Sequence, residues 1–408
     1  MNPLKKPPDF KNAQRIGIMG GSFDPIHYGH LSAAEGARHA LDLDFVLLIP
    51  TGQPPHKTST TFSEHRYLMT TLAAADNPYF YVSRMELDKQ GPSYTIDTLK
   101  ILKNETDAEL FFIVGADEMM RIMSWKDAVS LLGICHWIAA TRPGYDTSNL
   151  SIHIDSLAHT HGMRGQILKI PGIDISATEL RSRVINDIPI KYFIPPAVEK
   201  YIQDFGLYKH PDPKDKVIWQ AVADKLSKKR YRHTLGVLET ALLLAARHGI
   251  NLHETYLAAL LHDYAKELTE AEKRALCKEF NIPLDPIQTQ YINLMHGQLS
   301  AELARRQFNI EDTEVLEAIS YHTTGRTGMG ILEKIIKIAD NIEPNRPNYP
   351  GIETIKSLAN THLNQATAAS IKRDIQYTKE KGHTVHPWGQ LALEYLNTQF
   401  DYTTPKED

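Results

Sequence analysis

The chain has very little cysteine, since only Cys135 and Cys277 occur among its 408 residues and they lie far apart in the sequence. This scarcity argues against a disulfide framework and against a cysteine-rich zinc site, and it favours a reducing compartment. No run approaches the roughly 20 apolar residues of a membrane span, and the polar, proline-rich start from Met1 to Lys11 has no apolar signal core. We therefore expect a soluble, cytoplasmic protein without a membrane partner.

A surplus of positive charge is also missing, because the formal net charge is −4. Nucleic acid is therefore not an expected partner, although a local basic groove remains compatible with this balance. A length of 408 residues with 42% hydrophobic content is sufficient for two or three globular domains. Composition leaves the oligomeric state open, and a homo-oligomer is one of the open alternatives.

From Arg15 to about Gly206, short apolar runs alternate with segments of helical length. This alternation predicts βαβ units and a mostly parallel sheet, whose ligands bind at the carboxyl ends of the strands. The expected strands are Arg15–Met19, Phe45–Pro50, Phe80–Ser83 and Leu110–Gly115, with Trp137–Ala140 and Gln166–Ile170 as weaker cases. The expected helices include Ser32–Ala40, Ser63–Ala75 and Ser93–Leu102.

The pattern changes after His210–Lys214, where two prolines among charged or titratable residues indicate a linker. Beyond it, apolar residues recur at helical spacing and no convincing alternating strand is present, so residues 214–400 are predicted to be all-helical. The expected domains are therefore residues 12–208 and residues 214–400.

The most informative segment is Gly20–Leu31, which reads GGSFDPIHYGHL and lies between an expected strand and an expected helix. A strand, a glycine turn and a helix start direct free backbone N–H groups and the positive end of the helix dipole at one point, which suits a phosphate. His27 and His30 are three residues apart and can both lean toward that point, although two ordinary histidines near a turn would give the same pattern. The turn lacks G-x-G-x-x-G, and the chain contains no G-x-x-x-x-G-K-[ST] motif.

A second phosphate-binding candidate is the segment around Ser176. Ser176 and Glu179 have the spacing of a capping box, so a helix should begin there. The hydroxyls of Ser176 and Thr178, together with Arg181, could hold the β- and γ-phosphates of a triphosphate. A well-capped helix with a surface arginine is the plain structural alternative.

Two more segments follow expected strands. The loop Pro50–Lys57 carries His56 and Lys57 outward, which suits a second phosphate-bearing substrate, although a proline-rich surface loop has the same composition. In the segment Gly115–Trp125, Asp117 could accept hydrogen bonds from ribose hydroxyls and Trp125 could stack on a flat ring. A core tryptophan is the alternative reading of Trp125.

Together these segments resemble the bacterial nicotinate-mononucleotide adenylyltransferases over about residues 12–208. The matching text is GGSFDPIHYGHL (20–31), PPHK (54–57), SYTIDTL (93–99), GAD (115–117), RPGY (142–145) and ISATELR (175–181). The family commonly has the motif I-S-S-T, whereas this chain has I-S-A-T at residues 175–178, with Ala177 in place of the second serine. The resemblance therefore assigns the phosphate contacts to Ser176 and Thr178. Pantetheine-phosphate adenylyltransferases and cytidylyltransferases share the glycine-turn plan, but PPHK, SYTIDTL and RPGY favour the pyridine nucleotide branch.

The resemblance implies an α/β Rossmann-like nucleotidyltransferase domain that transfers AMP from ATP to nicotinate mononucleotide, giving deamido-NAD and pyrophosphate. Mg²⁺ would accompany the ATP, and the attack would be in-line without a covalent enzyme intermediate. His27 and His30 would contact the reacting phosphates as the catalytic pair. The implied ATP-binding residues are Gly20, Ser22, Phe23, Gly115, Asp117, Ser176, Thr178 and Arg181. The implied mononucleotide-binding residues are His56, Lys57, Thr95, Trp125 and Arg142, and the choice between nicotinate and nicotinamide is left open.

The helical half contains a histidine and carboxylate set with metal-ligand character: His233, His262, Asp263, His296, His322 and Asp340. The adjacent pair His262-Asp263 lies in an apolar segment that we expect to be helical, and a buried carboxylate needs a partner. On a helix, one member of the pair could bind one metal while the other reaches a second. Ligands of this kind without a thiol suit Fe, Mn or Zn, and two such ions could assist a phosphoryl displacement.

This order of residues resembles the HD superfamily, and its flanking text is similar to the YqeK-type branch of symmetrical diadenosine tetraphosphate hydrolases. The supporting text is YRHTLGVLETA (231–241), AALLHDYAKE (258–267), MHGQLSA (295–301), ISYHTTG (319–325) and KIADNIEPNR (337–346). The resemblance implies cleavage of diadenosine tetraphosphate to two ADP at a pair of transition-metal ions, with iron as the expected metal and Asp263 as a catalytic ligand. Arg346, Lys266 and Arg326 are candidates for phosphate-binding cations.

Three alternatives remain open at this point. The helical half could act on another nucleotide as a phosphodiesterase or phosphatase, or it could sense nucleotides without turnover. The first half could use its glycine turn on the backbone of a nucleic acid, although the acidic balance of the chain weighs against this.

Overall fold

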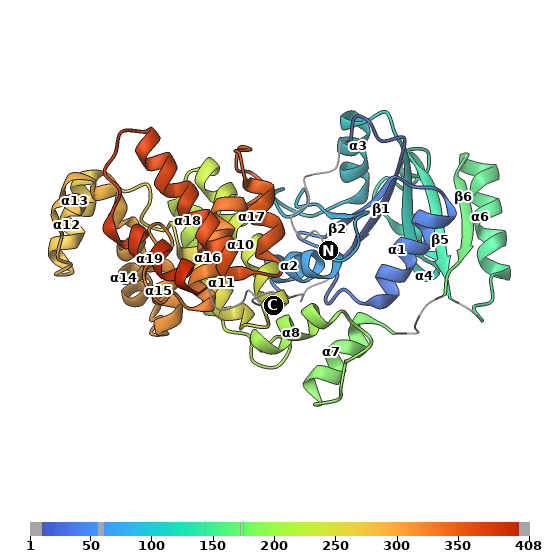
Figure 1. The fold of residues 1–408 in the computed structure, drawn as a ribbon. Helices are drawn as coiled ribbons and strands as arrows, with labels where there is room; N and C mark the ends of the chain where they lie inside the picture. Colours follow the sequence, from blue (N-terminus) through green and yellow to red (C-terminus); the bar gives the residue numbers. More distant parts are fainter. Residues whose placement is uncertain (1–9, 56–60, 143, 172, 174, 400–408) are drawn as a thin grey trace, which may run out of the picture. The chain divides into compact units, whose positions relative to one another are not determined.

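The computed structural model describes residues 10–55, 61–142, 144–171, 173 and 175–399. Over this range the chain forms two compact units, which divide between Pro211 and Asp212, inside the segment predicted as a linker. The first unit is α/β and the second is helical (Figure 1). The predicted fold class, a parallel-sheet domain followed by an all-α domain, is therefore confirmed.

The first unit is built on a six-stranded parallel sheet with the order β3-β2-β1-β4-β5-β6. The sheet is parallel because each strand is followed by a helical crossover, and its apolar strands are buried between the helices. The strands are β1 (Arg15–Gly21), β2 (Phe45–Pro50), β3 (Phe80–Val82), β4 (Glu109–Gly115), β5 (His136–Thr141) and β6 (Arg164–Lys169).

Helix α1 (Tyr28–Ala40) packs on the middle of the sheet, where it contacts β1, β2, β4 and β5 (Figure 1). Helix α2 (Ser63–Ala74) packs on β2 and β3. The remaining elements of this unit are α3 (Thr95–Glu105), α4 (Ala116–Met120), η1 (Ile122–Ser124), α5 (Ala128–Leu132), α6 (Ser148–His161), α7 (Ala177–Ile185) and α8 (Pro196–Asp204).

From β1 the chain adds β2 and β3 on one side of the sheet, and from β4 it adds β5 and β6 on the other side. The connections therefore run in opposite directions from the β1–β4 pair, and an opening lies between these two strands. The hydrogen-bonded register of the two strands stops at Ile18 and Phe112, although β1 continues to Gly21 and β4 to Gly115. The carboxyl ends of the two central strands therefore separate. In open α/β sheets this is the place where ligands bind.

The second unit is a helical bundle. Helix α16 (Ile331–Ile342) buries an almost continuous apolar face and contacts α10 (Lys228–His248), α11 (Leu252–Leu261), α15 (Thr313–Tyr321) and α18 (Leu363–Glu380). The other elements are α9 (Lys214–Lys225), α12 (Glu270–Glu279), α13 (Pro286–Gln290), η2 (Ile292–Met295), α14 (His296–Phe308), α17 (Ile352–Ala359) and α19 (Pro387–Thr398).

Two local expectations need correction. Helix α1 begins at Tyr28 rather than at Ser32, so His30 lies in its first turn and His27 is its N-cap. The pair His262-Asp263 does not lie inside a helix, because α11 ends at Leu261. Tight turns follow instead, in which Tyr264 N bonds Leu261 O and Lys266 N bonds Asp263 O.

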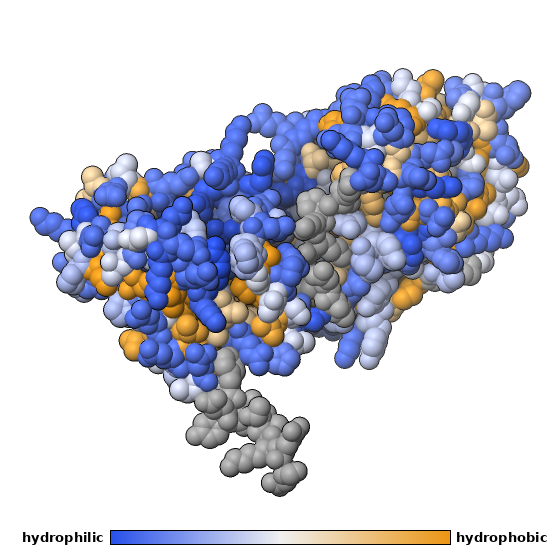
Figure 2. All heavy atoms as spheres, turned by 45° about the horizontal axis from the view of Figure 1, so that its top comes forward, coloured by the Kyte–Doolittle hydropathy of each residue, from blue (hydrophilic) through white to orange (hydrophobic). Residues whose placement is uncertain are grey.

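Within the described residues, no helix has both the length and the apolar composition needed to cross a bilayer. Hydrophilic residues cover most of the face drawn in Figure 2, with hydrophobic ones scattered among them. Cys135 and Cys277 are both buried as free thiols.

Candidate functional site

A cavity of about 1020 Å³ opens at the carboxyl ends of β1 and β4. Its walls come from the glycine-containing end of β1 with the loop that follows it, the start of α1, the start of α3, the segment after β4 and the start of α7. Of the residues predicted to act in the first half, it brings together Gly20, Ser22, His27, His30, Thr95, Gly115, Asp117, Trp125, Arg142 and Ser176. Residues from five separate segments of the chain thus face one space.

The two imidazoles lie against each other at the start of α1. Their ring centroids are 3.7 Å apart and their planes differ by 30°. The backbone N–H of His27 donates to Nδ1 of His30 over 3.3 Å. Because Nδ1 of His30 acts as an acceptor, the proton of its neutral ring lies on Nε2, which is then a hydrogen-bond donor.

His27 is deeply buried, with 5% of its surface exposed. Burial, and then the charge of Arg142, lower the pKa of His27 to about 4. Its Nδ1 is buried and makes no hydrogen bond within the described part of the chain. The ring rests on Gly29, where a Cβ would lie 2.9 Å from Nδ1 and Cε1, so only glycine allows this position.

Helix α7 begins at Ala177 as the capping pattern predicts. Ser176 is its N-cap, and the Ser176 hydroxyl accepts a bond from the backbone N–H of Glu179 over 3.1 Å. Arg181 donates to the Thr178 hydroxyl over 3.2 Å and to the carbonyl of Asp24 over 2.7 Å. Arg181 thereby ties α7 to the loop after β1.

Three predicted ATP-binding residues do not line the cavity: Phe23, Thr178 and Arg181. Phe23 is buried and supports His30, since the two rings meet edge to face with centroids 5.1 Å apart. Its backbone has φ +46°, which places the aromatic ring under the glycine turn.

On the other side of the cavity, Thr95 is the first residue of α3 and Trp125 follows η1. Trp125 also packs on the core, with its ring edge-on to Phe112 and Trp137, so the core reading and the cavity reading both apply. Arg142 donates to the carbonyl of Ile175 over 3.4 Å. The predicted residues His56 and Lys57 lie outside the described residues.

Sequence reasoning missed Arg66, which organises the loops around this cavity. Arg66 is fully buried in α2 and donates to the carbonyls of Ser22 and Thr51, each over 2.6 Å. It also donates to the carbonyls of Gly52 and Thr61, each over 3.0 Å. The available signal was an arginine inside an otherwise apolar helical stripe, which implies a buried charge that needs partners.

Glu86 is a second residue without a sequence motif. It is buried, lines the cavity and accepts a bond from the Thr98 hydroxyl over 2.7 Å. Burial raises the pKa of the Glu86 carboxyl. The backbone of Gly52 lies directly on this segment, because a Cβ there would lie 2.1 Å from the carbonyl oxygen of Glu86.

The second unit gathers all of the predicted metal ligands around Asp263. Its carboxylate lies 3.2 Å from Nε2 of His296, 3.4 Å from Nε2 of His262 and 3.7 Å from Nε2 of His322. Nε2 of His233 is 3.7 Å from Asp263 and 3.1 Å from Asp340. Two groups have metal-site spacing: His233, His262 and Asp340, and His262, Asp263 and His322.

All four histidines point Nε2 toward this centre because an outer partner holds Nδ1. His233 meets the Glu343 carboxylate at 3.1 Å and His262 meets the carbonyl of Ala259 at 2.7 Å. The same arrangement joins His296 to the Asn293 carbonyl (2.6 Å) and His322 to the Ile319 carbonyl (2.8 Å). Such outer bonds fix the tautomer that a metal-binding imidazole requires.

Orphaned polar atoms show that these residues fit a metal. Nε2 of His233, Nε2 of His262 and Oδ1 of Asp263 are buried without a hydrogen bond within the described residues. Burial, and then the charge of Lys266, lower the pKa of His296 to about 3, which keeps the ring neutral. Burial opposes ionisation of Asp263, but His262 and Lys266 hold its pKa well below the usual range. Imidazole nitrogens together with carboxylate oxygens, without a thiol, are a donor set that suits Fe, Mn or Zn.

Arg230 and Glu343 also belong to this centre but were not predicted. Arg230 donates to Oδ2 of Asp263 over 2.8 Å, and Glu343 orients His233 as described. Among the predicted cations, Lys266 lies 3.0 Å from Nε2 of His296, and Arg346 donates to Oδ1 of Asp340 over 2.5 Å. Arg326 does not lie here, because Glu333 and Glu317 hold its guanidinium near the start of α16.

The comparisons with known proteins match each unit separately. Residues 18–183 match the cytidylyltransferase-like family, and residues 230–345 match the HD domain family. The chain is 49% identical over 199 residues to a probable nicotinate-nucleotide adenylyltransferase of Moorella thermoacetica. The aligned region covers 48% of this chain and 92% of that protein. A probable nicotinate-nucleotide adenylyltransferase of a Thermoanaerobacter species is 46% identical over 199 residues, with 48% and 94% covered.

Among solved structures, a predicted HD superfamily hydrolase involved in NAD metabolism from Clostridium acetobutylicum is similar at 35% identity. The match covers 45% of this chain and 97% of that one, with a TM-score of 0.44. The predicted combination of a nucleotidyltransferase-like unit and an HD domain is confirmed by the two family matches.

Proposed function

We propose that this chain, which belongs to the nicotinate-nucleotide adenylyltransferase family, transfers AMP from ATP to nicotinate mononucleotide, releasing pyrophosphate and deamido-NAD. The observation that carries this proposal is the stacked pair His27 and His30, which lines a cavity of about 1020 Å³. A volume at the upper end of the range for small-molecule sites leaves room for two substrates side by side.

In this proposal catalysis is positioning plus charge stabilisation, because the mononucleotide phosphate attacks the α-phosphate directly. The Nε2–H of His30 donates to an oxygen of the α-phosphate as negative charge develops on it. His27 remains neutral at pH 7, because its pKa is about 4, and acts as a hydrogen-bonding group. Mg²⁺ carried with ATP would supply charge neutralisation along the triphosphate.

Most of the proposed binding roles fall on residues that line the cavity, whereas the roles of His56 and Lys57 rest on the sequence alone. Asp117 accepts hydrogen bonds from the adenosine ribose, and Gly20, Ser22 and Gly115 let the phosphates approach the backbone. Ser176 and the start of α7 hold the triphosphate tail, with Thr178 and Arg181 supporting from behind. Thr95 and Trp125 contact the pyridine ring, and Arg142, His56 and Lys57 hold the mononucleotide phosphate.

Product analysis tests this function on the full chain. With ATP and Mg²⁺, we expect deamido-NAD from nicotinate mononucleotide, measured by chromatography, and a lower rate with nicotinamide mononucleotide. Formation of neither dinucleotide by the folded protein would contradict the proposal. A higher rate with nicotinamide mononucleotide would contradict the assigned substrate only.

For the second unit, we infer a metal-dependent phosphohydrolase that cleaves diadenosine tetraphosphate to two ADP. The supporting observation is the convergence of four histidines and two aspartates, in which Nε2 of His233 and Nε2 of His262 are buried without a hydrogen bond within the described residues. The ligands would be His233, His262, Asp263, His296, His322 and Asp340, holding two transition-metal ions, with iron as the proposed metal. Bound ions would supply Lewis-acid activation of water and of the phosphate.

The residues of the chain orient this chemistry. Glu343 and the three backbone carbonyls hold the imidazoles, and Arg230 fixes the position of Asp263 through a hydrogen bond to Oδ2. Lys266 and Arg346 place positive charge beside the centre, where the phosphates of a substrate would lie.

Anaerobic purification, elemental analysis and a panel of dinucleoside polyphosphates test this second function. We expect about two equivalents of iron and ADP as the sole product of diadenosine tetraphosphate. Bound metal with hydrolysis of other nucleotides only would point to a different phosphohydrolase. Nucleotide binding without turnover would point to a sensing module.

A further inference from the structure

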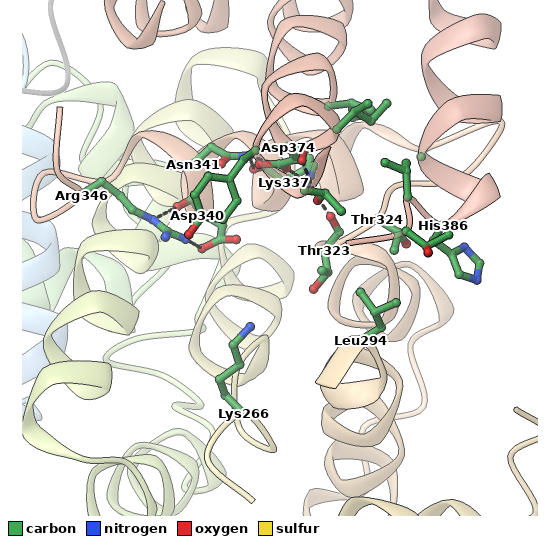
Figure 3. A pocket seen from close by; sticks show the side chains of 17 residues that line it. Lys266, Leu294, Thr323, Thr324, Lys337, Asp340, Asn341, Arg346, Asp374 and His386 are labelled. Atoms are coloured by element: carbon green, nitrogen blue, oxygen red, sulfur yellow. Dashed lines mark hydrogen bonds and ion pairs between the residues drawn. The ribbon is translucent and has the colours of Figure 1, made fainter. Parts of the chain in front are cut away.

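A second cavity, of about 260 Å³, lies in the helical unit beside the metal-ligand cluster. Asp340, one of the candidate ligands, forms part of its wall, and the cavity extends from there to Thr324 and His386 (Figure 3). One end therefore belongs to the phosphohydrolase centre. The other end is formed by α18 and by the segment that precedes α19.

The end near the cluster carries two cations, each beside a carboxylate. Lys266 and Arg346 line it, and Nζ of Lys266 lies 3.8 Å from Oδ1 of Asp263. Arg346 reaches the same end through its bonds to the carbonyl and the carboxylate of Asp340. A phosphate at the metal centre would lie between these two cations.

The middle of the cavity carries a fixed carboxylate, Asp374 on α18. Lys337, whose side chain is 1% exposed, donates to Oδ2 of Asp374, and Nδ2 of Asn341 donates to the same oxygen over 3.1 Å. The Asp374 side chain is still 36% exposed. Because a carboxylate has about four acceptor positions, Asp374 retains capacity for donors from a ligand. The remaining wall is mixed. Leu294, Ile371, Ile375, Tyr377 and Val385 supply apolar or aromatic surface, and four threonines with His386 supply hydrogen-bonding groups.

An end with two cations, a carboxylate in the middle and a mixed wall match the phosphate, ribose and base of a nucleotide, because a base has apolar faces and hydrogen-bonding edges. We propose that this cavity binds one nucleoside 5′-diphosphate portion of the substrate, with Asp374 accepting hydrogen bonds from the ribose hydroxyls. The proposal deepens the phosphohydrolase function and rests on it. A volume of about 260 Å³ is below the usual 300–1,000 Å³ of small-molecule sites, so it holds one nucleoside and leaves the second outside.

The experiment measures ligand protection at this cavity in the metal-loaded full chain. Hydrogen exchange is followed in peptides from α18 and the segment before α19 during titration with ADP, 2′-deoxyadenosine diphosphate and 3′-deoxyadenosine diphosphate. Site-resolved protection separates this cavity from the nucleotide site of the first unit. A hydrogen bond to a charged group contributes roughly 1.5–3 kcal/mol, so loss of a bonded hydroxyl should weaken binding at least about tenfold.

One of the two deoxy analogues should bind the unaltered chain much more weakly than ADP does. The variant Asp374→Asn should bind that analogue and ADP with similar affinity. Glu380→Gln is the matched control, because Glu380 is an exposed acid on the same helix, and it should keep the discrimination. If Asp374→Asn does not fold, the ligand series on the unaltered chain still decides the matter. Equal protection by ADP and both deoxy analogues would overturn the proposal, as would absence of protection by ADP.

These results are distinguishable from failure of the proposed phosphohydrolase function. Ribose-dependent protection without hydrolysis of any dinucleoside polyphosphate would retain the nucleoside site and reject the reaction. Hydrolysis without ribose-dependent protection would retain the reaction and reject the role of Asp374.

Discussion

Nδ1 of His30 accepts the backbone N–H of His27, so the cap of α1 and the orientation of an imidazole depend on one hydrogen bond of 3.3 Å. The bond satisfies a donor that every helix start leaves unpaired. It also selects the tautomer in which Nε2 of His30 carries the proton. The same hydrogen bond therefore caps the start of α1 and leaves Nε2–H of His30 available as a donor to a phosphate oxygen.

Replacement of His30 tests this relationship. His30→Ala should reduce dinucleotide synthesis by about 100-fold or more, the usual cost of losing one donor to a developing charge, while hydrolysis by the second unit stays intact. Steady-state rates of both reactions provide the measurement. His39→Ala, at the exposed end of the same helix, is the control and should leave both rates unchanged. Equal loss of both activities in a folded protein would refute independent sites.

The buried ring of His27 predicts a specific pH dependence. Its pKa is about 4 in the folded chain against an ordinary 6.5, so the unfolded chain binds more protons between these values. The free energy of unfolding of the first unit should therefore fall as pH decreases from about 6.5 to 4, by up to about 3 kcal/mol. Ring proton resonances should show no titration of His27 above pH 5, and the pH-dependent loss should be smaller in His27→Gln. A native titration midpoint near 6.5 would contradict the burial argument.

The close contact at Gly52 predicts that added volume there moves the loop after β2. Gly52→Ala places a Cβ 2.1 Å from the backbone carbonyl of Glu86, so the backbone must shift. We expect a several-fold or larger rise in the KM for the mononucleotide and a lower midpoint of thermal unfolding. Gly133→Ala is the matched control, because its Cβ would have no neighbour closer than 3.9 Å. Similar behaviour of the two variants would show that this loop does not position the substrate.

Removal of Asp263 should affect only the second unit. Asp263→Ala removes the carboxylate shared by all four histidines, so metal content and hydrolysis should both be lost while dinucleotide synthesis is retained. Elemental analysis and both activity assays measure this outcome. Asp224→Ala, an exposed acid on α9, should retain metal and both activities. Full metal content in Asp263→Ala would mean that the cluster is not the metal site.

Local patterns in the sequence were sufficient for much of the fold. The strand Phe45–Pro50 was predicted with its bounds, because its consecutive apolar residues favour a fully buried strand. The start of α7 followed from the spacing of Ser176 and Glu179. The start of α1 was placed too late, because Tyr28, Gly29 and His30 have no apolar periodicity although they are helical.

Site residues without a local pattern could not be found in this way. Arg66 donates to carbonyls of separate loops, and the backbone of Glu86 lies against Gly52. Asp374 on α18 forms an ion pair with Lys337 on α16. Apart from the bond of Arg66 to the Thr61 carbonyl, these contacts join residues that are distant in the sequence. The position of His262-Asp263 also escaped prediction, because a turn and a helix end can have the same composition.

The amino-acid sequence alone determined the types of residue available for each reaction and the local elements that carry them, since capping, periodicity and glycine turns act over a few residues. Tertiary structure decided which of them meet. Three features depend on contacts between distant segments: the separation of β1 from β4, the convergence of six candidate ligands from different helices and turns, and the burial of Arg66 beneath the loops. The energies of these contacts arise only when the chain is packed.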